Sequence, residues 1–223
     1  MRALAERGVA LLMVTTALSL LAALSAAVLV GSSLEVQIAS HFRDRWAGFY
    51  AAEAIAARAL DDMGAVSDWT RLLDGTSQSS FTDGQPGGLR ALADGTVVNM
   101  TEAMNLANCG KTASCTASDL AATTADRPWG ANNPQWRLYA WGWLRDLVAE
   151  ASGSPWYLLL SVGDDPAETD NAPLVDGGGA GQAGLGVVLL RAEAFGLRGA
   201  HAAVEVTVAR SPSLHVVAWR DLR

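Results

Sequence analysis

The longest hydrophobic segment of the chain lies close to its first residue. Residues 9–31, VALLMVTTALSLLAALSAAVLVG, carry no charged side chain. A helix of this length, at about 1.5 Å per residue, spans the roughly 30 Å hydrocarbon core of a bilayer. Arg2 and Arg7 precede the segment, and the positive-inside rule then keeps residues 1–8 in the cytoplasm and exports the remainder. The pattern predicts a membrane helix followed by an exported part.

The helical pattern continues beyond the membrane segment. Apolar residues recur at steps of three or four positions, the spacing of one helix face, at Leu34, Ile38, Phe42, Trp46, Phe49, Ala52, Ala56 and Leu60. No proline occurs between Met1 and Ala65. We therefore predict one continuous helix from about Val9 to Asp62, with residues 9–31 in the membrane and an amphipathic half at residues 32–63.

A cleaved secretory signal peptide and a generic single-pass anchor are two simpler interpretations of the same segment. An ordinary signal peptide has an apolar region of about 7–15 residues, and an unrelated mature sequence follows it. The run from Val9 to Gly31 is longer, and its helical pattern does not stop at the membrane edge. Both observations favour a helix that is retained.

The composition shifts toward Gly, Ser, Thr, Asn and Asp from Gly64 onward. Residues 64–133 contain few periodic runs, and we predict only single turns of helix, at Trp69 to Leu73 and at Ala117 to Ala122. The rest of this stretch is expected to be a long connection that packs across the helix.

Runs typical of β-strands begin at Trp136. The predicted strands are residues 136–144, 156–162, 187–195, 202–209 and 214–219. The third and fourth face each other across a turn at residues 196–199, and Val204, Val206 and Val208 alternate with polar neighbours. We predict an α+β fold, in which a long N-terminal hydrophobic α-helix packs on a C-terminal head, residues 64–223, with an antiparallel β-sheet of four or five strands.

Five tryptophans lie in or near the first two predicted strands, at positions 129, 136, 141, 143 and 156. They form either an exposed recognition surface or the packing of a small sheet beneath the helix. Large aromatic side chains more often cover a core, so the packing interpretation is favoured.

The chain has two cysteines, Cys109 and Cys115, in a polar Asn/Thr/Ser segment. Their spacing favours a small disulfide-closed loop, which requires an oxidising compartment. Two unpaired thiols that are merely close in sequence remain the alternative.

The densest group of acidic residues lies between the second and third predicted strands. The segment GDDPAETDNAPLVDG, residues 163–177, holds five carboxylates, Asp164, Asp165, Glu168, Asp170 and Asp176. Hard oxygen ligands of this kind suit calcium, which accepts six to eight of them in flexible geometry. The spacing does not match an EF-hand loop, and a solvated acidic loop is the simpler alternative. We treat the five as candidate calcium ligands, and no other cofactor is indicated.

Two classes of function are disfavoured by the sequence. A formal net charge of -7 offers no basic surface for the phosphates of a nucleic acid. No Gly-x-Ser-x-Gly motif occurs, and the glycine-rich run at residues 177–186 has no predicted helix after it, so that run reads as a flexible connection and not as a phosphate-binding loop. We predict that the protein is not an enzyme.

Three features together resemble the N-terminal domain of the PilX-like type IV pilus assembly proteins. They are the basic leader ending at Gly8, the apolar run from Val9, and the segment FRDRWAGFYAAEAIAARAL from Phe42 to Leu60. The resemblance covers about residues 1–63. It implies a leader peptide of residues 1–8, removed when prepilin peptidase cuts between Gly8 and Val9.

The resemblance also implies a role, partners and a location. The role is that of a minor pilin, a tip or initiating subunit that serves pilus assembly, adhesion or display. The partners are other pilins, contacted through the N-terminal helix, and prepilin peptidase. The precursor would sit in the inner membrane as a single-pass protein with its head in the periplasm, and the mature subunit in a surface pilus.

One position departs from the pattern of the major pilins. They carry a glutamate at the fifth mature position, which here is Met13. The departure fits a minor subunit and not the main building block of a filament. The alternatives are a minor pseudopilin of a type II secretion system and a membrane-anchored exported binding domain that is not processed as a pilin.

Overall fold

The computed structural model describes residues 2–177, 184–211 and 213–222, with the backbone alone described for residues 2–8. The chain forms two compact units, Met1–Asp44 and Arg45–Arg223. Helix α1 (Arg2–Met63) contributes to both of them.

The first unit is α-helical at every residue that the structure describes. Gly31 lies inside α1 without ending it, as the absence of proline predicted. The helix begins at Arg2, so it includes most of the predicted leader as well as the apolar run from Val9. The large apolar side chains between Val9 and Ile38 are exposed.

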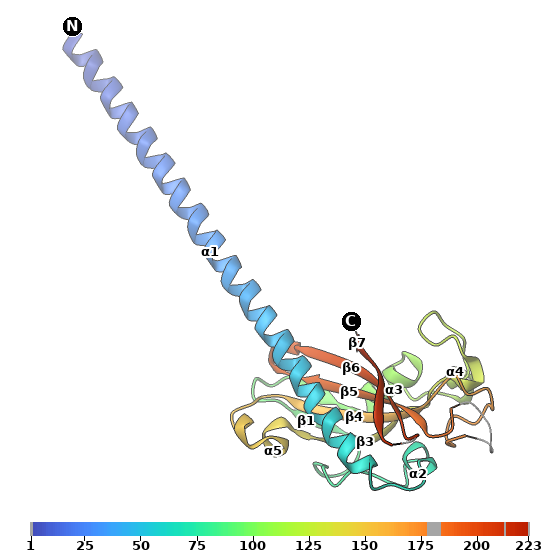
Figure 1. The fold of residues 1–223 in the computed structure, drawn as a ribbon. Helices are drawn as coiled ribbons and strands as arrows, with labels where there is room; N and C mark the ends of the chain where they lie inside the picture. Colours follow the sequence, from blue (N-terminus) through green and yellow to red (C-terminus); the bar gives the residue numbers. More distant parts are fainter. Residues whose placement is uncertain (1, 178–183, 212, 223) are drawn as a thin grey trace. The chain divides into compact units, whose positions relative to one another are not determined.

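The second unit is built on a five-stranded antiparallel sheet with the order β3-β4-β5-β6-β7 (Figure 1). The strands are β3 (Arg137–Trp143), β4 (Tyr157–Asp164), β5 (Val187–Phe195), β6 (His201–Ala209) and β7 (His215–Leu222). Each strand pairs with the next one in the sequence. All five predicted strands are present, and the predicted α+β fold is confirmed.

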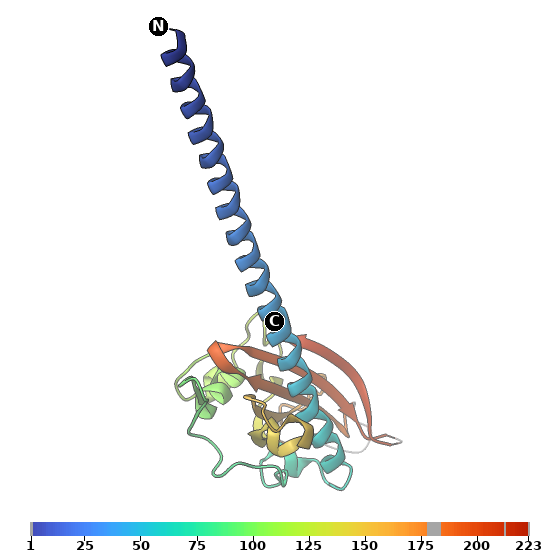
Figure 2. The same cartoon turned by 90° about the vertical axis from the view of Figure 1, so that its left-hand side faces the viewer.

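The C-terminal turns of α1 pack on one face of this sheet (Figure 2). The helix contributes small side chains at Ala51, Ala52, Ala56 and Ala59, all of them buried, together with Ile55 and Met63. Alanines let the helix backbone approach the sheet closely. The sheet contributes larger side chains to the same core, including Leu158, Leu160, Val204 and Val206. The predicted alternation along β6 is confirmed, since Val204, Val206 and Val208 are buried on the helix side.

The opposite face of the sheet is covered by elements that the sequence did not reveal. These are a hairpin of β1 (Leu89–Ala91) and β2 (Val97–Asn99), followed directly by α3 (Met100–Cys109). Leu92, Val98 and Met100 pack there against Trp141, Tyr157 and Leu159. Strand β4 is therefore buried on both faces, which explains its continuous apolar sequence.

The expected course of residues 64–133 needs correction. The segment around α2 (Thr70–Leu73) packs with the helix through Trp69, Leu72 and Leu73. Residues 79–81 also reach it, because Arg58 donates to Ser80 Oγ and Ser79 Oγ donates to Asp62. The hairpin and α3 lie on the other side of the sheet, because β4 and β3 carry apolar side chains on both faces and both must be covered.

The remaining elements are short. They are α4 (Ala117–Leu120), α5 (Leu144–Leu147) and three 3-10 turns, η1 (Gly130–Asn132), η2 (Ala149–Ala151) and η3 (Leu197–Gly199). The packing interpretation of the tryptophans is confirmed at Trp136, Trp141 and Trp156, which are buried, whereas Trp129 is exposed.

Candidate functional site

The apolar part of α1 has the properties of a membrane-spanning segment. It is the one helix among the described residues that is long and apolar enough to cross a membrane, and none of its most hydrophobic 18-residue window is buried inside the protein. Its hydroxyl groups are satisfied locally, since Thr16 Oγ1 donates to the Met13 carbonyl at 2.9 Å and Ser25 Oγ to the Leu21 carbonyl at 2.8 Å. A hydroxyl bonded within its own helix avoids the cost of an unpaired polar group in hydrocarbon.

The predicted processing site lies within this helix. The backbone of both Gly8 and Val9 is α-helical, and the surroundings of Gly8 are outside the described side chains. Val9 and Met13 are exposed. Cleavage between Gly8 and Val9 stays a prediction.

The two cysteines form a disulfide between Cys109 and Cys115, in agreement with the prediction. Cys109 is the last residue of α3, and Gly110 follows it in the left-handed conformation that ends the helix. The disulfide thus closes a loop directly after a helix that packs beneath the sheet.

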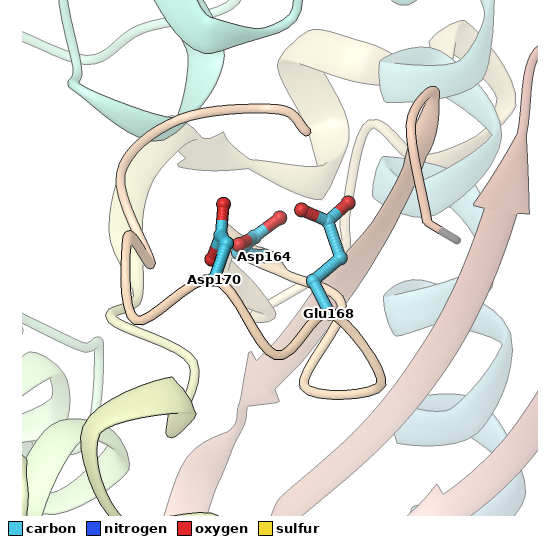
Figure 3. Close-up of side chains that lie close together, drawn as sticks. All are labelled: Asp164, Glu168 and Asp170. Carbon is cyan, nitrogen blue, oxygen red and sulfur yellow. The ribbon is translucent and has the colours of Figure 1, made fainter. Parts of the chain in front are cut away.

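The structure brings together three of the five predicted calcium ligands (Figure 3). One oxygen each from Asp164, Glu168 and Asp170 lies within 4.8 Å of the other two. Asp164 ends β4, and the other two residues belong to the connection between β4 and β5. Asp165 and Asp176 do not join this group. Asp165 Oδ1 accepts a hydrogen bond from the Ala167 N–H, and Asp176 Oδ1 accepts one from the Gly186 N–H.

In two of the grouped carboxylates, one oxygen is hydrogen-bonded to the loop backbone and the other has no partner. Glu168 Oε2 accepts a hydrogen bond from the Gly177 N–H at 3.1 Å, and Asp170 Oδ1 accepts one from the Ala172 N–H at 2.9 Å. Their other oxygens, Oε1 of Glu168 and Oδ2 of Asp170, are buried without a hydrogen-bond partner, as is Oδ1 of Asp164. Five buried side-chain polar atoms in the described part of the chain lack a partner, so this one group accounts for most of them.

The group is strongly unfavourable for negative charge. Burial raises the pKa of Asp164 to about 8, with further contributions from Glu168 and Asp170, and the nearby Asp165 N–H only partly opposes this shift. Burial likewise raises the pKa of Glu168 to about 7, again with a contribution from Asp170. Asp164 is 3% exposed and Glu168 is 2% exposed.

Glycine backbone closes the group on one side. Gly184, at φ +100°, lies so near Glu168 that an added Cβ would come within 2.2 Å of its Cγ and 2.5 Å of its Oε1. Gly177 also has a positive φ, and a Cβ there would meet Leu185 at 2.7 Å. These two glycines come from the glycine-rich run, whose central residues 178–183 lie outside the described residues, so the prediction of a flexible connection there is not tested.

The arrangement offers oxygen donors and no nitrogen or sulfur donor, which is the set that a hard divalent cation prefers. The sequence showed that the five acids belong to one loop. It did not distinguish the three grouped carboxylates from the two that bond to backbone, because that depends on how the loop folds back on β4. Compared with protein-family models, curated protein sequences and solved structures, the chain has no match to any of them.

Proposed function

We propose that this protein is a minor subunit of a type IV pilus. Prepilin peptidase would cut the inner-membrane precursor between Gly8 and Val9, and the mature subunit would join the filament at low stoichiometry, at the tip or as an initiating subunit. Its helix would contact other pilins, and its head would serve assembly, adhesion or display.

The observation that carries the proposal is the double character of α1. Between Val9 and Gly31 the helix exposes large apolar side chains, and its threonine and serine hydroxyls donate to carbonyls of the same helix, so this part suits lipid and equally a bundle of similar helices. After Arg45 the same helix supplies Ala52, Ile55 and Ala56 to the core of the head. A simple anchor needs only the first property.

The small residues of the apolar segment support assembly into a bundle. Ala22, Ala23, Ala26 and Ala27 lie within it, and small side chains let membrane helices approach closely. Met13 stands where the major pilins have an acid. A subunit without that carboxylate cannot neutralise the terminal amine of a neighbour in a low-dielectric bundle, which favours a minor position in the filament.

The first experiment is mass spectrometry of the mature N-terminus in cells that make prepilin peptidase. A chain that begins at Val9 supports the proposal. A chain that keeps Met1, or one cut near Ala27, contradicts it and favours an uncut anchor or a signal peptide. Gly8→Val provides the matched variant, and we expect it to accumulate as the precursor.

Immunogold labelling of sheared filaments is the second experiment. Sparse labelling along pili or at their ends supports a minor pilin. If the processed protein never appears on pili, the proposal is wrong, and a minor pseudopilin of a type II secretion system becomes the better interpretation.

A further inference from the structure

The buried acids of the head fall into two kinds. Glu193 on β5 has a polar partner at each oxygen, because Arg191 Nε donates to its Oε1 at 2.5 Å and His201 Nε2 lies 2.9 Å from its Oε2. In the described part of the chain, no Lys, Arg or His forms an ion pair with Asp164, Glu168 or Asp170. Carboxylates that are buried without a counter-charge are costly, and burial of acidic groups together is found where a metal neutralises them.

We propose that Asp164, Glu168 and Asp170 bind one calcium ion, which fastens the β4–β5 connection to the end of β4. The two unpartnered oxygens of Asp164 and Glu168 belong to side chains that are almost fully buried and that face the same group (Figure 3). A cation bound by the three unpartnered oxygens would give each of them a partner and would leave the hydrogen bonds of Glu168 Oε2 and Asp170 Oδ1 intact.

Calcium fits this donor set better than other common metals. Zinc prefers histidine and cysteine, and neither is among the grouped residues. Magnesium demands near-ideal octahedral geometry and usually keeps several waters. Calcium tolerates an irregular arrangement and takes carboxylates in monodentate or bidentate fashion, so the three carboxylates supply about three or four of its six to eight ligands while they keep their hydrogen bonds.

Contacts within the protein already position the three carboxylates, including Asp170, whose Oδ1 accepts from the Ala172 N–H. Asp164 is fixed in β4 opposite Val188 of β5. Glu168 is held by the Gly177 N–H and by the close backbone of Gly184. Ligands fixed in this way need little reorganisation to receive an ion.

The same loop reaches two other parts of the head. The Asp176 N–H donates to Thr70 Oγ1 of α2 at 3.2 Å, and the Asn171 N–H donates to Asn132 Oδ1 of η1 at 2.7 Å. Without the ion, the three buried acids lie together at the base of the loop with no cation among them, which should weaken both contacts. Calcium binding should therefore stabilise residues 165–177 in this conformation, and this holds whether or not the protein is a pilin.

Calorimetry of the full-length chain in detergent, titrated with calcium chloride, tests the proposal. We expect one ion per chain, and magnesium to bind at least about tenfold more weakly. At a calcium concentration 100 times Kd the Tm should rise by about 5–10 °C. Hydrogen exchange of residues 165–177 should slow on addition of calcium.

Matched variants locate the site. Asp170→Asn and Glu168→Gln keep side-chain size and should weaken calcium binding about tenfold or more, whereas Asp165→Asn, in the same loop but outside the group, should bind as the unmodified chain does. Absence of calcium binding by the unmodified chain overturns the proposal, and so does equal loss in Asp165→Asn. Should magnesium bind as tightly as calcium, the assignment to calcium is wrong. Because these readouts are binding and Tm, they are independent of N-terminal processing and of pili.

Discussion

Gly48 of α1 lies directly against the indole ring of Trp156. A Cβ added at position 48 would come within 2.8 Å of Trp156 Cη2 and 3.0 Å of its Cζ3. On another side, a Cβ at Gly196 would come within 2.7 Å of the same ring. The tryptophan that precedes β4 therefore fills a space that exists only because two glycines line it.

This contact predicts that Gly48→Ala destabilises the head. Alanine is the better helix former by about 1 kcal/mol, but forcing a methyl group into a filled space costs about 1–3 kcal/mol. We expect a net loss of about 1 kcal/mol, measured as a lower Tm of the full-length chain in detergent.

Gly31→Ala is the control for that change. Gly31 also lies inside α1, and an added Cβ there would meet nothing within 4 Å. We expect no loss of Tm. If the two alanine variants behave alike, the close approach of Trp156 does not limit stability.

The elements that could be predicted from the sequence are those with a regular hydrophobic pattern along their whole length. Helix α1 has uninterrupted helical spacing, and Val204, Val206 and Val208 of β6 alternate cleanly because one side of the strand is buried. Strand β4 was recognisable as a continuous apolar run, but which side each residue faced followed only from the structure.

The hairpin of β1 and β2 and helix α3 were missed although local signals for them exist. Asp94 and Gly95 form a turn signal between the two short strands. Asn99 caps α3 by accepting from the Glu102 N–H, and Gly110 ends it. Each of the two strands has only three residues, which is too few for a hydrophobic periodicity to be recognised. For the same reason the sequence did not predict which elements cover the second face of the sheet.

Removal of the disulfide should destabilise the head moderately. Replacing Cys109 and Cys115 together by serine opens a short loop. The disulfide lowers the conformational entropy of the unfolded chain, and for a loop of this length that contributes about 2 kcal/mol to the free energy of unfolding. Chemical denaturation should show a loss of this size. A reducing agent should lower the stability of the unmodified chain and leave the double variant unchanged, and an equal effect on both would contradict the prediction.

The stability of the head should depend on pH through Glu193. Burial alone would raise its pKa, but the hydrogen bond from His201 and the charge of Arg191 outweigh burial and hold the pKa below its ordinary value of 4.5. A carboxyl with a lowered folded pKa contributes stability above the unfolded pKa and loses it as the pH falls through the folded value. We expect Glu193→Gln to cost about 1–3 kcal/mol at neutral pH.

Thermal unfolding between about pH 7 and about pH 3 measures this contribution as the difference in Tm between the unmodified chain and Glu193→Gln. The difference should be constant near neutrality and shrink below about pH 4.5. Glu205→Gln on β6 is the control, because Glu205 pairs with the exposed Arg220 and such a pair is worth under about 1 kcal/mol. A difference that does not shrink in acid would contradict the role given to the Glu193 charge.

The aromatic side chains of Trp46, Phe49 and Tyr50 should separate assembly from folding. Their ring centroids lie 5.7–5.9 Å apart. Trp46 is 45% exposed and Tyr50 is 61% exposed, whereas Phe49 is partly buried and packs against the core of the head. If the protein is a pilus subunit, the exposed rings lie on the helix that contacts its neighbours.

Trp46→Ala is therefore expected to lower the Tm by less than Phe49→Ala does, because its ring is 45% exposed, and to lower the amount of protein in sheared filaments. Phe49→Ala is the matched change on the same turn of helix, and it should lower the Tm because it removes a side chain that the core contacts. Immunoblots of filaments and of whole cells, read together with the Tm of each purified variant, distinguish the two effects. Normal incorporation of Trp46→Ala would show that this surface of α1 does not contact other subunits, while a fall in its Tm as large as that of Phe49→Ala would assign Trp46 to the fold instead.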